Sequence, residues 1–146
     1  YNNRGKVKDG LKDYYGAIAD YTKAIELNAH LLDPQLFYNR GITKYSLKYY
    51  NSAIADFTRA IELSPNFPEA YNNRGLSKDG LKDFSGAIAD YTKAIELNPN
   101  RAGSFYNRGL SKYYLGDKNG ACQDARKAQQ LGVNASPLIK GACLLY

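Results

Sequence analysis

A 28-residue stretch occurs twice in this chain with four differences. Residues 1–28 read YNNRGKVKDGLKDYYGAIADYTKAIELN, and residues 71–98 read YNNRGLSKDGLKDFSGAIADYTKAIELN. More diverged copies begin at Phe37 and Phe105, and each copy carries one Asn-Arg-Gly motif, with its glycine at Gly5, Gly41, Gly75 or Gly109. The last two spacings between these glycines are equal, and the first is two residues longer. A fixed period of roughly 20 to 50 residues is typical of a solenoid, in which each unit buries its apolar face against its neighbours.

The periodicity inside each unit is helical. Apolar residues recur at steps of three and four through residues 85–97, which predicts an amphipathic helix. A partner helix precedes it, from near the leading aromatic residue to the leucine of "GLKD", "SLKY" or "YLGD". Pro65 and Pro99 follow the second helix, where proline cannot continue it. Each unit is therefore predicted to be an antiparallel helical hairpin, and the fold class all-α.

Small residues recur in phase with the repeat. Each motif glycine precedes an alanine at a constant separation, which gives the pairs Gly5 and Ala17, Gly41 and Ala53, Gly75 and Ala87, and Gly109 and Ala121. Glycine costs a helix about 1 kcal/mol relative to alanine, so four glycines at one phase need a packing reason. We expect close approach of the two helices at these pairs.

The pattern resembles the tetratricopeptide repeat family over nearly the whole chain. The aromatic, Gly, Ala, aromatic, Ala and Pro positions of the family are matched by Tyr71, Gly75, Ala87, Tyr91, Ala94 and Pro99, and by Phe37, Gly41, Ala53, Phe57, Ala60 and Pro65. The resemblance implies a right-handed superhelix forming a single domain over 1–146, with repeats at about 1–31, 34–67, 68–101 and 102–133. Ala29 replaces a proline and Ala125 an aromatic residue, and two extra residues in "NAHLLDP" are expected to disturb the superhelix locally.

All four units carry an arginine where the family commonly has leucine, and an aspartate at a constant separation after it. The pairs are Arg4 and Asp20, Arg40 and Asp56, Arg74 and Asp90, and Arg108 and Asp124. An early residue of the first helix faces a middle residue of the second, so the two sets are expected to meet. We interpret them as structural pairs that hold the hairpins in register, because an unpaired arginine beside a packed glycine would be costly to desolvate. The alternative interpretation is that the four arginines form a basic stripe that binds a ligand.

The C-terminal segment predicts a capping helix. Gly132 can end the preceding helix in the left-handed conformation, Ser136 offers an N-cap and Pro137 a first helical residue. A helix over about 137–145 would then cover the last hairpin with Leu138, Ile139, Ala142 and Leu145.

Cys122 and Cys143 lie at expected heights of about 13 and about 9 Å from the turn between their helices, so they are expected to lie close together. The sequence favours neither a disulfide between these cysteines nor a pair of buried free thiols over the other. A disulfide would indicate export, and similar cysteine-bearing endings in bacterial repeat proteins of this type favour the cell envelope or the exterior.

The resemblance also implies a binding surface. In tetratricopeptide proteins the first helices line a concave groove, where asparagine ladders can hold a peptide backbone. The corresponding residues here are Asn3, Asn39, Asn73 and Asn107, preceded by Asn2, Tyr38, Asn72 and Tyr106. The residues expected to supply side-chain pockets are Tyr38, Leu76, Tyr106, Leu110, Tyr45 and Tyr113. The family's clamp for a C-terminal carboxylate needs clustered cations, whereas Lys6 is the one basic residue at the later groove positions. An internal extended segment is therefore the expected ligand, unless the asparagines merely bond neighbouring helices.

Several function classes are disfavoured. His30 is the one histidine and is expected in a loop, so we expect no enzyme, no metal site and no cofactor. A net charge of +6 and a pI near 9.2 come without a nucleic-acid motif, so nucleic acid is not the expected partner. No apolar run reaches the roughly 18–20 residues of a membrane span. Residues 1–10 are not expected to act as a signal peptide, because no apolar run follows their basic residues.

We therefore expect a protein-protein interaction scaffold whose partner is a protein or peptide. The alternative is a structural protein that assembles end to end. Position 1 is Tyr1 and the chain has no methionine, so we expect a processed chain or a piece of a longer one. The sequence also begins inside a helix, so its N-terminal end is expected to be covered by further repeats, by self-association with another copy, or by solvent.

Overall fold

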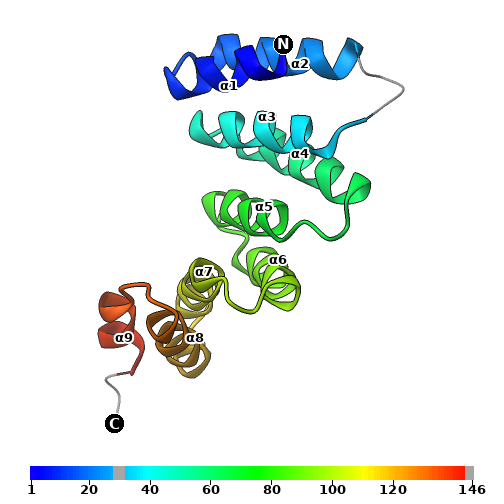
Figure 1. Cartoon of the computed structure of the whole chain (residues 1–146). Helices are drawn as coiled ribbons and strands as arrows, with labels where there is room; N and C mark the ends of the chain where they lie inside the picture. Colours follow the sequence, from blue (N-terminus) through cyan, green and yellow to red (C-terminus); the bar gives the residue numbers. More distant parts are fainter. Residues whose placement is uncertain (28–31, 144–146) are drawn as a thin grey trace.

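A computed structural model gives the fold, and it describes residues 1–27 and 32–143. Within them the chain forms nine helices and no strand (Figure 1). The helices are α1 (Asn2–Gly10), α2 (Tyr14–Leu27), α3 (Pro34–Ser46), α4 (Tyr50–Leu63), α5 (Pro68–Gly80), α6 (Phe84–Leu97), α7 (Ala102–Tyr114), α8 (Lys118–Gln130) and α9 (Ser136–Cys143). The predicted all-α superhelix of helical hairpins is confirmed. His30 and Leu145, and with them the predicted end of the capping helix, lie outside the described residues.

The hairpins stack in chain order from α1/α2 to α7/α8, and the two ends of the chain lie at opposite ends of the stack (Figure 1). The first helices α1, α3, α5 and α7 contact one another in turn, and α9 continues the series by contacting α7. Within the described residues, the second helices α2, α4, α6 and α8 do not contact one another. The first helices therefore lie on the inside of the curve, and α9 takes the place of a fifth inner helix.

The first helices of the later units begin three residues before their aromatic residue, one turn earlier than the leading aromatics suggest. Pro34 and Pro68 stand at the first helical position, where a missing N–H costs nothing. Asp33 adds an N-cap by accepting a hydrogen bond from the Gln35 backbone N–H at 2.8 Å. These prolines start helices, a role that sequence reasoning gave to Pro137 but not to Pro34 or Pro68.

A left-handed residue joins the two helices of each hairpin. Lys12, Lys48 and Lys82 adopt φ values of 62°, 61° and 62°, and Gly116 takes the same place in the last unit with a φ of 86°. Residues with a Cβ adopt this region at a cost of roughly 1 kcal/mol, which glycine avoids. The turn is therefore set by the packing of the two helices and not by the lysine itself.

In three of the four units, the atoms closest to the motif glycine belong to an aromatic ring of the second helix. A Cβ on Gly5, Gly41 or Gly75 would stand 2.7 or 2.8 Å from a ring carbon of Tyr21, Phe57 or Tyr91. Each ring belongs to the second helix of the same unit and is buried. The packing reason for the glycine is thus a ring lying flat against the first helix.

The last unit replaces that ring with a side chain from α9. Gly109 has the Leu138 side chain 3.0 Å and the Ala121 carbonyl oxygen 3.2 Å from where its Cβ would stand. Ala125 occupies the aromatic position of this unit and is fully buried. The capping helix therefore supplies from outside the hairpin the apolar group that the hairpin lacks.

The turn into α9 differs in part from the prediction. Gly132 is left-handed, with a φ of 98°, as its position after α8 predicts. Ser136 is the first helical residue and not the N-cap, because Asn134 Oδ1 accepts a hydrogen bond from the Ser136 backbone N–H at 3.2 Å. An asparagine side chain caps as well as serine does, and here it lies two residues before the first free N–H.

Candidate binding groove

The predicted groove residues lie on the inner helices, and most of them are partly buried. Asn3 is exposed and Asn72 is buried, with 6% of its surface accessible. Tyr38 packs against Phe67 with ring centroids 4.7 Å apart, and Tyr45 packs against Tyr50 at 5.7 Å. The tyrosines are therefore held in place by their own repeats and present one edge to the inner surface.

The asparagines make contacts that run along the inner surface. Asn39 Oδ1 accepts a hydrogen bond from Gln35 Nε2 at 2.8 Å, and Asn73 Nδ2 donates to Tyr38 Oη at 3.0 Å. Among the described residues, Asn39 Nδ2 and Asn2 Oδ1 are buried without a hydrogen-bond partner. Both atoms are shielded from solvent by the surrounding protein atoms.

Asn72 belongs to the joint between α5 and α7. Its Oδ1 accepts from Ser104 Oγ at 2.9 Å and from Asn107 Nδ2 at 3.5 Å. Its Nδ2 donates to Asn73 Oδ1 at 3.3 Å. This residue is engaged by neighbouring helices, as the alternative interpretation of the asparagines expects, and Asn73 is likewise bonded to Tyr38 of α3.

The arginines and aspartates predicted to pair lie together in all four units. In the third unit Arg74 Nε and Nη2 donate to the two oxygens of Asp90 at 3.0 and 2.7 Å, and Arg74 Nη1 donates to Thr58 Oγ1 of the preceding unit at 3.1 Å. The same arrangement joins Arg40 to Asp56 and Thr22, and Arg108 to Asp124 and Thr92. Each of these guanidinium groups therefore links two successive hairpins.

The first unit differs because the structure has no hairpin before it. Arg4 donates to both oxygens of Asp20, and its side chain is 59% exposed, compared with 17% for Arg74. The hydrogen bond from Arg4 holds the pKa of Asp20 well below its usual range, against the opposing effect of burial. The ionised pair persists here with fewer neighbours than in the later units.

Sequence reasoning missed a second cation at each aspartate. Lys78 Nζ lies 2.8 Å from Asp90 Oδ2, and Lys8, Lys44 and Lys112 contact Asp20, Asp56 and Asp124 in the same way. Each lysine follows its arginine by four residues, which places both on one face of the helix. The four-residue spacing between arginine and lysine was the sequence signal from which this second contact could have been predicted. These four lysines are therefore engaged inside the hairpins.

A carboxylate on the inner surface was also missed. Asp79 accepts hydrogen bonds from Tyr91 Oη at 2.7 Å and from Ser111 Oγ of the next inner helix at 2.8 Å. Burial raises the pKa of Asp79 above its ordinary value, although these two donors oppose the rise. Asp9 likewise accepts from Thr43 Oγ1 at 2.8 Å. These acids connect inner helices to one another.

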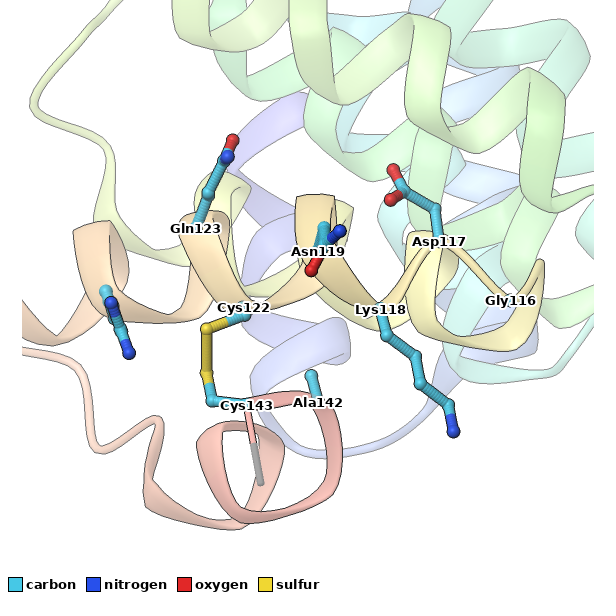
Figure 2. Close-up of a pocket in the computed structure, with 9 residues that line it drawn as sticks. Gly116, Asp117, Lys118, Asn119, Cys122, Gln123, Ala142 and Cys143 are labelled. Atoms are coloured by element: carbon cyan, nitrogen blue, oxygen red, sulfur yellow. A yellow bond between two sulfur atoms is a disulfide. The ribbon is translucent and has the colours of Figure 1, made fainter. Parts of the chain in front are cut away.

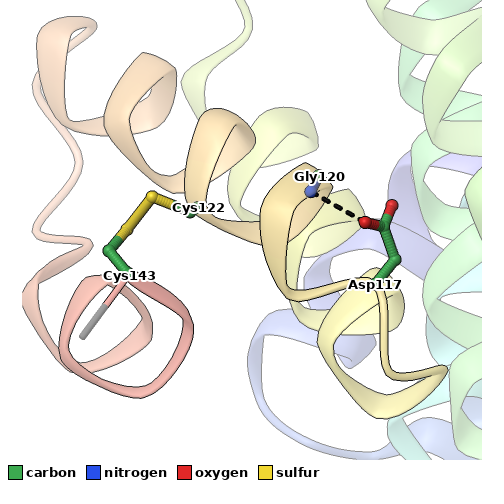
Figure 3. Close-up of a disulfide and its surroundings, with 4 residues drawn as sticks. All are labelled: Asp117, Gly120, Cys122 and Cys143. Carbon is green, nitrogen blue, oxygen red and sulfur yellow. Dashed lines mark hydrogen bonds between the residues drawn. A yellow bond between two sulfur atoms is a disulfide. The ribbon is translucent and has the colours of Figure 1, made fainter. Parts of the chain in front are cut away.

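The cysteines lie within bonding distance, and the structure joins Cys122 of α8 to Cys143 of α9 (Figure 3). Their Cα atoms are 5.1 Å apart, within the range of disulfides. A cavity of about 560 Å³ lies beside the bond, on the outer side of α8, with Lys118 and Arg126 among its lining residues (Figure 2). Figure 3 also shows Asp117 capping the start of α8 through the Gly120 N–H, at 2.8 Å.

A second, smaller cavity of about 180 Å³ lies at the C-terminal end of the inner surface. It is lined by Tyr106, Leu110, Tyr113, Tyr114, Pro137, Leu138 and Gly141. Three of these residues, Tyr106, Leu110 and Tyr113, were predicted from the sequence to supply side-chain pockets. The contribution of α9 could not be read from the repeat pattern, because α9 lies outside it.

Stacked helical hairpins with a row of inner helices define an α-solenoid of the type that presents an extended inner surface. Sequence profiles described as "Tetratricopeptide repeat" match residues 1–30 and 68–101, and one described as "TPR repeat" matches residues 43–78. The chain belongs to the tetratricopeptide repeat family.

Solved structures with the same fold include three that cover most of the chain. "Crystal structure of MamA protein" is 23% identical with a TM-score of 0.87, over 97% of this chain and 80% of that one. "YrrB: a TPR protein with an unusual peptide-binding site" is 25% identical with a TM-score of 0.82, over 96% and 71%. "First TPR of Spaghetti (RPAP3) bound to HSP90 peptide SRMEEVD" is 22% identical with a TM-score of 0.74, over 76% and 90%.

A comparison with curated protein sequences finds no match. In the part of the chain that the structure describes, none of the helices combines the length and the apolar character needed to cross a membrane.

Proposed function

We propose that this chain is a non-catalytic interaction scaffold that binds an extended, internal segment of a partner protein along the inner surface of α1, α3, α5 and α7. The observation that carries the proposal is the row of amide side chains on these helices, in which Asn3 is exposed and Asn39, Asn73 and Asn107 are partly exposed. An amide bonds a main chain whatever its sequence, because it both donates and accepts. Membership of the tetratricopeptide repeat family, and the peptide-binding site named for YrrB, support this reading.

The charges on the hairpins favour an internal segment over a chain terminus. A terminal carboxylate needs cations free to bind it, and the lysine that follows each motif glycine by three residues contacts the aspartate of its own hairpin. Ile42, Leu76 and Leu110 occupy the later groove positions in the other units. The same engagement removes these lysines from the charge available to nucleic acid.

The test begins with peptides selected against the chain from a random display library and measured by calorimetry. Replacing Asn39, Asn73 and Asn107 together by alanine should weaken binding at least tenfold. The matched control replaces the exposed Asn51, Asn66 and Asn119 by alanine and should bind as the unmodified chain does. If the groove variant loses stability while its folded fraction binds normally, the asparagines are architectural and the proposal is wrong.

A second candidate function is self-association through the N-terminal side of α1. Val7 and Leu11 are 62% and 75% exposed, and Tyr1 and Tyr15 are also exposed. Thr43, Ser77 and Ser111 stand in the other units at the position of Val7, and all three are buried. Sedimentation at increasing concentration should show assembly, and Val7→Ser should reduce it. A monomer at every concentration would dismiss this candidate.

A further inference from the structure

We propose that the cavity between α7 and α9 is a pocket for one leucine- or phenylalanine-sized side chain of the bound segment. This inference rests on the proposed function, because it assigns a ligand class to one end of the same inner surface. It adds the capping helix to the binding machinery. The ligand would then be an extended segment with an apolar side chain where it reaches the last hairpin.

The size and lining of the pocket fit such a side chain. Its volume of about 180 Å³ is slightly larger than a cavity of about 150 Å³ that binds benzene when lined by apolar residues. Tyrosine, leucine, proline and glycine line it, and none of these described residues is charged. A charged side chain entering this space would lose hydration without gaining a partner.

The pocket exists because the joint between α7 and α9 differs from the joints before it. Between α5 and α7, Ser104 and Ser111 reach back to bond Asn72 and Asp79. Among the described residues, no side-chain hydrogen bond joins α7 to α9. Gly141 of α9 lies opposite the Tyr113 side chain and, as a glycine, leaves the space between them empty. A Cβ at Gly141 would stand 3.4 Å from Tyr113 Oη, in ordinary contact.

The walls of the pocket are held in place. Leu138 is 4% exposed and packs at Gly109. The bond from Cys143 to Cys122 ties the end of α9 to α8 (Figure 2). A preformed pocket of this kind binds without first ordering its own walls.

A peptide side chain is the occupant that the surroundings favour. Tyr106 and Leu110 belong both to the pocket and to the row of inner-helix residues that includes Asn107. A chain lying along that row would place its backbone at the amide and a side chain at the pocket. The volume suits one such side chain and is too small for an acyl chain.

The test uses capped single amino acids and therefore needs no knowledge of the partner. Acetyl-leucinamide and acetyl-phenylalaninamide are titrated into the isotope-labelled chain, and amide shifts are followed by NMR, with acetyl-glutaminamide as the polar control. Saturable shifts are expected at Leu110, Leu138 and Gly141 with the apolar probes and not with the polar one. Absence of these shifts, or equal shifts with the polar probe, overturns the proposal.

Two variants add the same side chain inside and outside the pocket. Gly141→Leu places a leucine side chain in the cavity and should weaken the binding of the apolar probes at least tenfold. Lys140→Leu places the same side chain at an exposed position of α9 and should leave their binding unchanged. Glycine to leucine favours a helix, so Gly141→Leu is expected to fold. Equal binding by Gly141→Leu and the unmodified chain overturns the proposal.

Display-selected peptides separate this inference from the proposed function. If selected peptides depend on the groove asparagines but tolerate alanine at every apolar position, the pocket assignment fails and the scaffold function stands. If the capped leucine binds at Leu138 while no selected peptide depends on the asparagines, the scaffold function fails. A requirement for one leucine or phenylalanine, lost with Gly141→Leu, supports both.

Discussion

The linking role of the arginines can be tested by comparing one substitution in two nearly identical units. Residues 1–28 and 71–98 differ at four positions, so Arg4→Leu and Arg74→Leu change the same residue in almost the same local sequence. What differs is the hairpin before it. Arg74 bonds Thr58 of the preceding unit and is 17% exposed, whereas the structure contains no unit before Arg4, which is 59% exposed.

The expected loss for Arg74→Leu follows from the bonds removed. Two hydrogen bonds to Asp90 and one to Thr58 disappear, and a bond to a charged group contributes about 1.5–3 kcal/mol. Lys78 remains within 2.8 Å of Asp90, so the carboxylate is not left without a cation. We therefore expect a loss of about 2–3 kcal/mol, below the roughly 3–5 kcal/mol of a buried pair broken outright. Arg4→Leu should lose less than half as much, because exposed ion pairs contribute little.

Urea unfolding followed by far-UV circular dichroism measures both losses, provided that the slope of free energy against urea is the same in each variant. Equal losses at the two positions would refute the view that Arg74 links hairpins, and would leave a role confined to its own unit. A larger loss for Arg4→Leu would refute it as well.

The lysine changes the outcome expected of paired substitutions. Reasoning from two partners alone, removing Arg74 and Asp90 together should cost less than removing one of them. Because Lys78 also contacts Asp90, the variant that leaves no charge behind is the triple replacement of all three by leucine. Asp90→Leu alone strands two cations and should be the most destabilising of the set. If the triple variant is less stable than Asp90→Leu, the three side chains do not act as one network.

Three further outcomes are expected. In the same urea assay, Gly75→Ala should destabilise the chain by about 1–3 kcal/mol, because the added Cβ would stand 2.7 Å from the Tyr91 ring. Gly103→Ala in α7 is the matched control and should stabilise by up to about 1 kcal/mol, because its Cβ would meet no atom within 4 Å. Replacing Cys143 by serine should cost about 3 kcal/mol, from the loop of 21 residues that the bond closes, and should speed hydrogen exchange in α9. Burial raises the pKa of Tyr21 to about 12, so as the pH rises the unfolded chain loses the Tyr21 hydroxyl proton before the folded chain does. The free energy of unfolding should therefore fall between about pH 10 and 12, and Tyr21→Phe should make that fall smaller.

The repeat pattern is sufficient to predict most of the fold. A period of about 34 residues, with one glycine and one second-helix aromatic in most units, fixes helical hairpins in series, and the superhelix and family that it predicts are confirmed. The constant separation between Arg74 and Asp90, and between their equivalents in the other units, likewise indicated contact across each hairpin. Spacing within one unit was sufficient for these predictions because both partners lie in the same hairpin.

The contacts between different units could not be predicted from the sequence, because they depend on the angle between successive hairpins. Whether Asn72 faces a ligand or the next helix is decided by where Ser104 lies, and Ser104 belongs to a different hairpin 32 residues away. The pocket at Gly141 depends on how α9 docks, and α9 has no counterpart in the repeat. The predicted peptide contacts of the asparagines accordingly stay predictions.

A core aromatic residue and the inner-surface residue beside it change together from unit to unit. Tyr91 needs an acceptor for its hydroxyl in the core, and Asp79 supplies it at 2.7 Å. The second unit has Phe57 in place of that tyrosine and Tyr45 in place of the aspartate, so the core residue and the inner-surface residue change together.

It follows that the chemistry of the inner surface is tied to the core beneath it, with acids in units one and three and tyrosines in two and four. Tyr91→Phe should therefore lose about 1–3 kcal/mol in urea unfolding, because half-buried Asp79 keeps only Ser111 as donor. Tyr91→Phe combined with Asp79→Leu should lose less than the two single losses added together. Strict additivity would show that the two positions vary independently and that the alternation has no physical basis in the core.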